Sequence, residues 1–192
     1  ITTATVYDTE GFPLYLKGDG IDDFMSTAAI DFTGTDKLAL WAGVTKLDDT
    51  TRMVAELSAN VNAGSFYMVA GTNGAYSQAY TAISRGTAPA DAGQTARYTG
   101  VPAPDAAILT VTHDISGDLS TINRNGVAGV NGTYDKGAGN FGNYPLYIGC
   151  RAGTGIFFND NLYPLVIAGA LYDANTVDKM NQYVAKKSGV TL

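Results

Sequence analysis

The chain has 192 residues and a net charge of −6, with 45% hydrophobic and 16% charged residues. Its 23 glycines and 12 tyrosines favour many short strands joined by turns, and exclude a helical bundle or a disordered chain. The acidic balance and the scattered basic residues argue against nucleic-acid binding, because phosphate contacts need clustered Lys and Arg. We expect one domain covering residues 1–192, of a length that can bury a substantial core.

The first half of the chain predicts a series of strands. After a β-prone run at residues 3–7, the stretch from Leu14 to Thr27 (LYLKGDGIDDFMST) predicts a hairpin-like unit that bends at Gly18 to Gly20. Residues 37–47 are apolar on both alternating faces, which predicts a strand covered on both sides. Further strands are expected at residues 52–58, 65–70 and 75–84, the last with Tyr76 and Tyr80 on one face, and a short element at 95–98.

The second half continues this pattern and ends in a helix. Residues 107–115 predict a strand, and Asn125-Gly126 predicts a tight hairpin between strands at 119–123 and 127–130. Residues 131–143 predict an exposed loop, followed by strands at 145–151, 155–158 and 162–171. Asn175 predicts a helix cap, Val177, Met180 and Val184 share one helical face, and Gly189 ends the helix.

Cysteine content, hydrophobic runs and the first residue of the chain lead to three further expectations. Cys150 is the only cysteine, so no intrachain disulfide forms, and its apolar neighbours predict a buried thiol. No apolar run approaches the roughly 20 residues that span a bilayer, so we expect no membrane insertion. Because the chain starts at Ile1 without a leader, we expect it to be a piece of a longer protein.

Three segments together resemble the concanavalin A-like lectin/glucanase superfamily, in its laminin-G-like jelly-roll branch. They are Leu16 to Phe24 (LKGDGIDDF), Leu38 to Trp41 (LALW), and the ending from Pro145 to Gly149 with residues 163–172 and the capped helix. The chain departs from the branch at Lys17-Gly18, where Phe usually precedes Asp-Gly. The resemblance implies an all-β fold: an antiparallel two-sheet jelly-roll sandwich with a short C-terminal helix. The ending is also similar to C-terminal domains of bacteriophage structural proteins and bacterial surface proteins, which implies a virion-surface or extracellular location.

Candidate catalytic and metal-binding residues are few. Asp19, Asp22 and Asp23 offer oxygens that Ca²⁺ prefers, but Asp at such a bend commonly accepts backbone hydrogen bonds, so we interpret the group as a structural turn and expect no cofactor. Asn159-Asp160-Asn161 is interpreted as a second turn. Glu10 and Glu56 are the only glutamates and lack the Glu-x-Asp-x-(x)-Glu strand motif of the superfamily's hydrolases, and His113, the only histidine, has no Gly-x-Ser-x-Gly partner. The sequence therefore predicts a protein that is not an enzyme.

Carbohydrate binding asks for aromatic faces beside Asn, Asp and glycine backbone groups. Two loops, residues 71–80 and 131–143, offer this mixture, and their candidate ligand-binding residues are Asn73, Tyr76, Tyr80, Tyr134, Asp135, Asn140, Phe141 and Asn143. The alternative is that these are ordinary loops of a jelly roll. Trp41 is also a candidate for sugar stacking, but a core position is expected.

Two functional hypotheses follow. The first is a binding module for a glycan or cell-surface molecule, as the adhesion or receptor-recognition domain of a phage tail or capsid protein. The second is a virion decoration or assembly domain that contacts other virion proteins or like subunits and has no sugar site. The fold alone does not decide between them.

Overall fold

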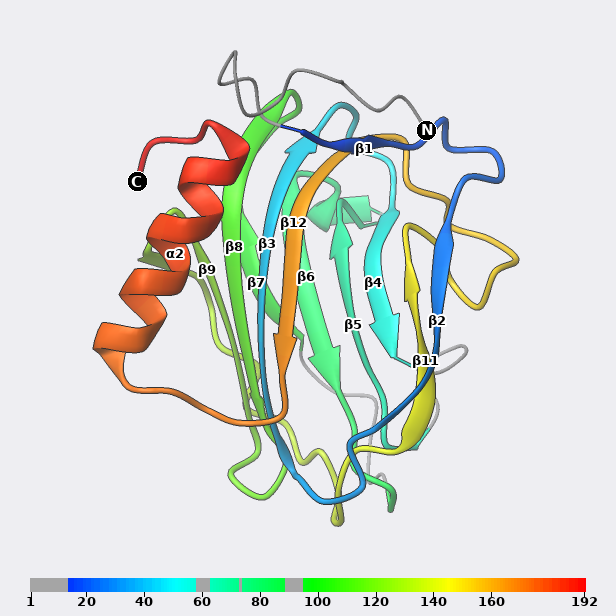
Figure 1. Ribbon diagram of the computed structural model, residues 1–192, viewed down its shortest axis with the longest axis vertical. Coiled ribbons are helices and arrows are strands. Elements are labelled where there is room, and N and C mark those ends of the chain that lie inside the picture. Colours follow the sequence, from blue (N-terminus) through cyan, green and yellow to red (C-terminus); the bar gives the residue numbers. More distant parts are fainter. Residues whose placement is uncertain (1–13, 58–62, 73, 89–94) are drawn as a thin grey trace.

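Two six-stranded antiparallel sheets pack face to face (Figure 1). The computed structural model describes residues 14–57, 63–72, 74–88 and 95–192; the strand predicted at residues 3–7 lies outside this part. Together with the single C-terminal helix of the described part, the two sheets confirm the predicted jelly-roll sandwich.

Sheet A contains β1 (Leu16–Lys17), β12 (Asn161–Ala168), β3 (Lys37–Lys46), β8 (Asp105–Asp114), β9 (Leu119–Arg124) and β10 (Val127–Ala128). Sheet B contains β2 (Met25–Asp31), β11 (Asn143–Ile148), β4 (Arg52–Leu57), β5 (Phe66–Ala70), β6 (Ala79–Ser84) and β7 (Ala96–Thr99). A 3-10 helix, η1 (Gly74–Tyr76), lies between β5 and β6, and the helix α2 (Ala174–Ser188) follows β12.

The hairpin predicted from Leu14 to Thr27 is wrong. Strand β1 pairs with β12 in sheet A, whereas β2 pairs with β11 in sheet B, so the chain crosses between the sheets at residues 18–24. The glycine bend hydrogen-bonds to another segment: the Gly18 N–H donates to Asp160 O (3.3 Å) and the Gly20 N–H to Phe158 O (3.0 Å). The bend is real, but its hydrogen-bond partners are distant in sequence.

Strand β3 is covered on both faces, as predicted. One face, with Leu38 and Leu40, lies in the core between the sheets, and the other, with Ala39 and Trp41, packs under α2. Trp41 is 1% exposed and its ring lies 5.9 Å from that of Tyr172, which confirms the core position. Figure 1 shows α2 lying along the outer face of sheet A.

Helix α2 begins earlier than predicted. Asp173, not Asn175, is the cap: its carboxylate accepts the Thr176 N–H at 2.7 Å. An Asp in extended backbone accepts an N–H of the first helical turn that has no partner within the helix. The sequence pattern had suggested Asn175 for this role. Val184 is buried against sheet A, with Val177 and Met180 packed beside it as predicted, and Gly189 ends the helix in the left-handed conformation.

The turn predictions have mixed outcomes. Asn125 (φ 50°) and Gly126 (φ 78°) form the predicted hairpin turn between β9 and β10, and β7 confirms the element expected at 95–98. The strand predicted at residues 75–84 begins only at Ala79, because a loop that includes η1 precedes it and the Gly71 N–H donates to Ala79 O at 2.7 Å. Residues 155–158 are not a strand; they follow a turn at residues 152–154 that the Arg151 N–H to Gly155 O bond closes (2.7 Å).

Candidate functional site

The outer face of sheet B is distinct from that of sheet A because α2 packs on sheet A alone. Side chains alternate along a strand, so residues that neighbour core-facing positions point outward. Met68 and Ala82 lie in the core, and the outward positions beside them are Tyr67, Val69, Thr81 and Ile83. We call the surface formed by this set, by Arg97 of β7 and by the stacking residues Tyr76 and Arg151 the sheet B face.

A tyrosine and an arginine stack at one side of this face. The Arg97 guanidinium carbon lies 4.1 Å from the centre of the Tyr76 ring, and Tyr76 is 43% exposed. Thr81 is the cross-strand partner of Arg97 in the β6–β7 register and is 2% exposed. Within the described residues, Arg97 Nε and the Thr81 hydroxyl make no hydrogen bond. Both atoms are buried in this structure.

A second pair lies over β5. The Arg151 guanidinium carbon is 5.1 Å from the centre of the Tyr67 ring, and Arg151 Nε is 3.4 Å from Glu56 Oε1. Glu56 is fully buried, and it faces Tyr67 across the β4–β5 register. The loop after β11 carries Arg151 to this position. Since β5 and β7 lie two strands apart, the two pairs are roughly 10 Å from each other.

This arrangement combines aromatic rings with hydrogen-bond donors on a β-sheet surface. Stacking on tyrosine limits the freedom of an arginine side chain and leaves the edge of its guanidinium group available to an acceptor. The face can therefore bind a molecule that has both a ring face and oxygen acceptors.

The structure separates the two loops that the sequence predicted as one sugar site. Tyr76 lies where β5 connects to β6. The loop 131–142 is tied to the opposite ends of these antiparallel strands, because the Gly86 N–H donates to Lys136 O and the Gly142 N–H to Gly64 O, both at 2.8 Å. The two loops are therefore about one strand length, roughly 17 Å, apart.

Tyr80 and Phe141 are fully buried in the core. The Tyr80 hydroxyl donates to the Asp105 carboxylate at 2.8 Å, and burial raises the pKa of this hydroxyl. The Phe141 ring packs edge-on against Phe66, with 6.1 Å between the ring centres. Neither ring presents a face to a ligand in this structure.

The other candidates are polar residues at the far end or lie outside the description. Tyr134 is exposed, and the Asp135 carboxylate accepts the Gly137 N–H at 2.8 Å. Asn140 donates to Thr33 O at 2.6 Å, and Asn143 pairs with Asp31 at the start of β11. Asn73 lies outside the described residues. Of the predicted set, Tyr76 is the member on the sheet B face.

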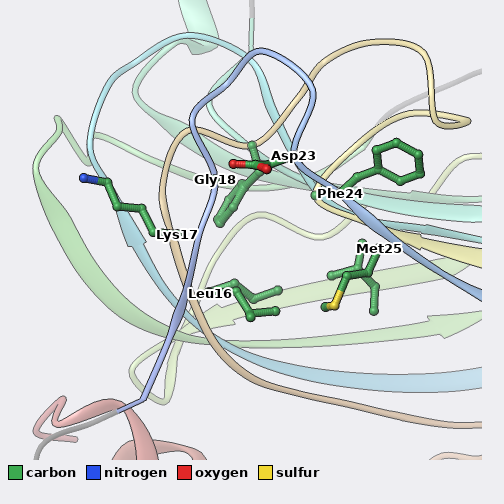
Figure 2. Close-up of a pocket in the computed structure, with 10 residues that line it drawn as sticks. Leu16, Lys17, Gly18, Asp23, Phe24 and Met25 are labelled. Atoms are coloured by element: carbon green, nitrogen blue, oxygen red, sulfur yellow. The ribbon is translucent and has the colours of Figure 1, made fainter. Parts of the chain in front are cut away.

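A pocket opens at the sandwich edge formed by β1 and β2 (Figure 2). Its lining is mostly apolar and comes from both sheets and the crossing loop: Leu16, Lys17, Gly18, Asp23, Phe24, Met25, Ile148, Gly149, Phe158 and Leu162. Such a lining suits an apolar group and offers few of the polar partners that sugar hydroxyls require.

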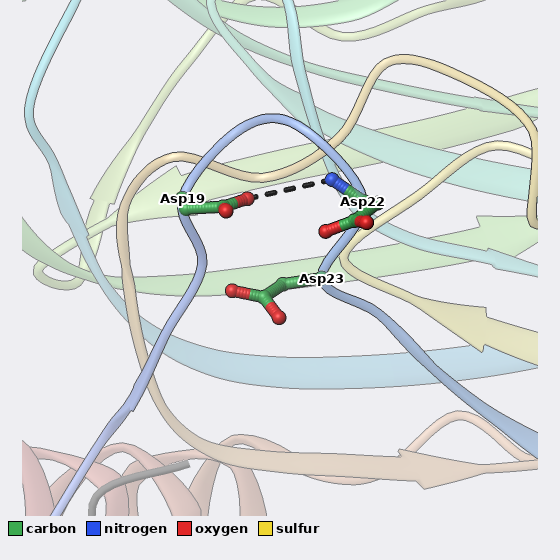
Figure 3. Close-up of side chains that lie close together, drawn as sticks. All are labelled: Asp19, Asp22 and Asp23. Carbon is green, nitrogen blue, oxygen red and sulfur yellow. Dashed lines mark hydrogen bonds between the residues drawn. The ribbon is translucent and has the colours of Figure 1, made fainter.

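The three aspartates of the crossing loop lie together at the surface (Figure 3). One oxygen from each can be chosen so that all three lie within 4.8 Å of one another. Asp19 Oδ1 accepts the N–H groups of Ile21 (2.8 Å) and Asp22 (3.4 Å), and these backbone bonds lower the pKa of its carboxyl. The predicted structural turn at Asp19 is confirmed.

Asp160 is a buried carboxylic acid that sequence reasoning interpreted only as part of a turn. It is 0% exposed, and one oxygen accepts the Leu47 N–H at 2.7 Å. Burial raises its pKa to about 6, and the nearby Asp48 carboxylate adds to this effect. Asp48 has a pKa lowered to about 2 despite its own desolvation, because Arg52 and Asn159 donate hydrogen bonds to it. The group joins the loop after β3 to the start of β12.

His113 and Cys150 are both buried within the fold. His113 Nδ1 lies 2.8 Å from the Ser120 hydroxyl, and burial lowers the pKa of the imidazole to about 3, so the ring is neutral at pH 7. Cys150 is fully buried, as predicted.

Comparisons with known proteins support the fold. No protein-family model and no curated protein matches the sequence. Among solved structures, a Limulus polyphemus pentraxin superposes with a TM-score of 0.62 at 10% identity, covering 87% of this chain and 80% of the pentraxin. The Ruminococcus gnavus sialidase module CBM40, solved with α2,3-sialyllactose, gives 0.57 at 12% identity, covering 88% and 97%.

The mouse laminin α1 chain domains LG4-5 give a TM-score of 0.57 at 12% identity over 80% of this chain, which spans 40% of the laminin structure. These identities show the fold alone. The chain thus has the concanavalin A-like, laminin-G-like fold that its sequence resembles. No helix of the described residues is long and apolar enough to cross a membrane.

Proposed function

We propose that this chain is a non-catalytic module that binds a glycan or glycosylated cell-surface molecule through the sheet B face. The observation that carries the proposal is the stack of Arg97 on the exposed Tyr76 ring. An exposed ring can cover the apolar side of a pyranose while the arginine binds its oxygens. A structurally similar module, CBM40, was solved with a sialylated sugar, which supports this choice of ligand class.

The carboxylates of the described residues give little support to catalysis. Glycoside hydrolysis needs two carboxyl groups flanking the scissile bond, one of them with a raised pKa. Glu56, on the sheet B face, is buried and paired with Arg151. Asp160 has a raised pKa but is fully buried at the loop junction, so a substrate does not reach it.

The resemblance to C-terminal domains of phage structural proteins adds a biological setting to the proposal. In this setting the module recognises the host cell from the surface of a virion. The alternative is an assembly domain that contacts other virion proteins or like subunits and binds no glycan.

A glycan array probed with the purified chain tests the proposal. We expect binding to a subset of glycans, loss of most of this binding in Tyr76→Ala, and retention in Tyr134→Ala, whose exposed ring is at the opposite end of the sandwich. Incubation of the bound glycan with the protein, followed by mass spectrometry, is expected to recover it uncleaved. Absence of binding to every glycan would favour the assembly role, and cleavage would contradict the non-catalytic assignment.

A further inference from the structure

We infer that the ligand of the sheet B face is acidic: a glycan whose carboxylate or sulfate group is bound by Arg97, with Arg151 contributing positive charge. This inference rests on the proposed function and specifies the class of glycan.

The first argument is the distribution of arginines. The chain carries 18 acidic and 12 basic residues, so positive charge is scarce. Arg52, Arg124 and Arg151 are engaged in ion pairs within the protein, with Asp48 (2.9 Å), Asp105 and Glu56 (3.4 Å). Arg97 lies on the sheet B face beside Tyr76 and has no ion pair among the described residues.

The second argument is the small amount of negative charge on this face. Among the described residues of β4 to β7, Glu56 is the only carboxylate, and it is buried beside Arg151. The sum of Glu56, Arg97 and Arg151 is positive on a protein whose net charge is −6. A local positive surface on an acidic protein selects small anionic groups, whereas the overall charge repels a long polyanion such as nucleic acid.

The third argument is that the Arg97 guanidinium group is held in position and has no ion pair among the described residues. Its guanidinium group is held against the Tyr76 ring at 4.1 Å, and no ion pair to Arg97 occurs within the described residues. The planar donor edge of arginine matches the two oxygens of a carboxylate or sulfate.

Calorimetric titration with three related sugars tests the inference: 3′-sialyllactose, 3′-sulfolactose and lactose. We expect both acidic sugars to bind at least about tenfold more tightly than lactose, the effect of one charge-assisted contact, and the preference to shrink when salt rises. The sialylated and sulfated sugars distinguish a carboxylate from a sulfate as the preferred anion.

Substitutions at Arg97 locate the effect. Arg97→Ala is expected to reduce the affinity for the preferred acidic sugar to about that for lactose, and Arg97→Lys to recover only part of it, because lysine keeps the charge but loses the planar pair of donors. Lys179→Ala on the exposed surface of α2 is the control: it removes one positive charge far from the sheet B face and is expected to leave the affinity unchanged. Thermal melting of each variant verifies that it is folded.

The outcomes separate the inference from the proposed function. If lactose binds as tightly as the acidic sugars, or if Arg97→Ala in its folded state keeps the preference, the inference is wrong while a glycan-binding role remains. If a panel that includes neutral and acidic glycans shows no binding at all, the proposed function is wrong, and the inference falls with it.

Discussion

The two outer faces of the sandwich differ in what they present. On sheet A, Ala39, Trp41 and Ile108 form an apolar surface that α2 covers. On sheet B, the outward positions include the buried Val69, Thr81 and Ile83, and two stacked pairs, Tyr76 with Arg97 and Tyr67 with Arg151. The same architecture thus uses one face to bury apolar area and the other to display donors and rings.

This difference indicates where function and stability reside. Burial of an aromatic side chain under a helix stabilises the fold, because it removes apolar surface from water. Holding guanidinium groups beside tyrosine rings contributes little to stability at an exposed site, about 0.5–1 kcal/mol each. A face that keeps such pairs is better explained by binding than by folding.

Removing the largest side chain of the covered face should have the greatest effect on stability. We expect Trp41→Ala to lower the free energy of unfolding by about 3–5 kcal/mol, the usual cost of emptying a large buried aromatic position. Urea denaturation measures this change. Glycan affinity per folded molecule should stay within about twofold of the original, since the covered face makes no contact with the proposed ligand. A folded variant with lost affinity would break the separation of the two faces.

A smaller effect on stability is expected at Asp160, which joins the loop after β3 to the start of β12 and belongs to neither face. The Asp160 carboxyl has a pKa of about 6 in the fold against its ordinary value of 3.8, so its ionisation disfavours the folded state as pH rises through this interval. Asp160→Asn removes this charge while its side-chain oxygen can still accept the Leu47 N–H. We therefore expect the variant to gain stability relative to the original protein between pH 4 and pH 7, by up to roughly 3 kcal/mol.

Denaturation curves at several pH values measure that gain. Asp160→Ala is the contrasting variant, because it also removes the acceptor of the Leu47 N–H and leaves that group unpaired. A stability difference between Asp160→Asn and the original that does not change with pH would show that the carboxyl is not buried in solution.

On the open face the expected effect is on binding. Tyr76→Ala removes the ring that supports Arg97 and covers the sugar, and we expect about a tenfold weaker affinity, which corresponds to about 1.4 kcal/mol. Its thermal stability should change little, because the side chain is 43% exposed. Tyr134→Ala is the matched control, with an equally exposed tyrosine at the other end of the sandwich. Equal loss of affinity in both variants would contradict the assignment of the site to one face.

The smallest effect is expected from calcium. Asp19 already accepts backbone N–H groups that fix the crossing loop, so the aspartate group serves the fold without an ion. We expect the melting midpoint in millimolar Ca²⁺ to equal that in chelator. A clear upward shift would reveal a ligand that binds the native state and would overturn this interpretation.

Much of the fold could be predicted because its signals are local. The alternation of residues 37–47, the Asn125-Gly126 turn and the apolar stripe of Val177, Met180 and Val184 each specify an element without reference to the rest of the chain. The error at residues 14–27 shows the limit. Glycines predict that a chain bends, but whether the next strand joins the same sheet depends on partners more than a hundred residues away, here β11 and β12.

The candidate site was less predictable for the same reason. Tyr76 stood out as an aromatic residue in a loop rich in small polar residues, whereas Arg97 and Arg151 each resembled an ordinary surface charge. Pairing of β5, β6 and β7 and the path of the loop after β11 bring them to one face. Tyr80 and Phe141 carry the same local signal as Tyr76 but lie in the core, because alternation directs Tyr80 inward and the loop after β10 folds Phe141 under Phe66.

The most direct test of the central claim is to locate the ligand on the protein. Nuclear magnetic resonance spectra of the ¹⁵N-labelled chain, recorded during titration with the glycan that binds best, report on each backbone amide and on arginine Nε–H groups. The account predicts that the shifts concentrate on β5, β6, β7, Tyr76 and the Nε–H groups of Arg97 and Arg151. Shifts concentrated at residues 131–143 or around the pocket between β1 and β2 would contradict it.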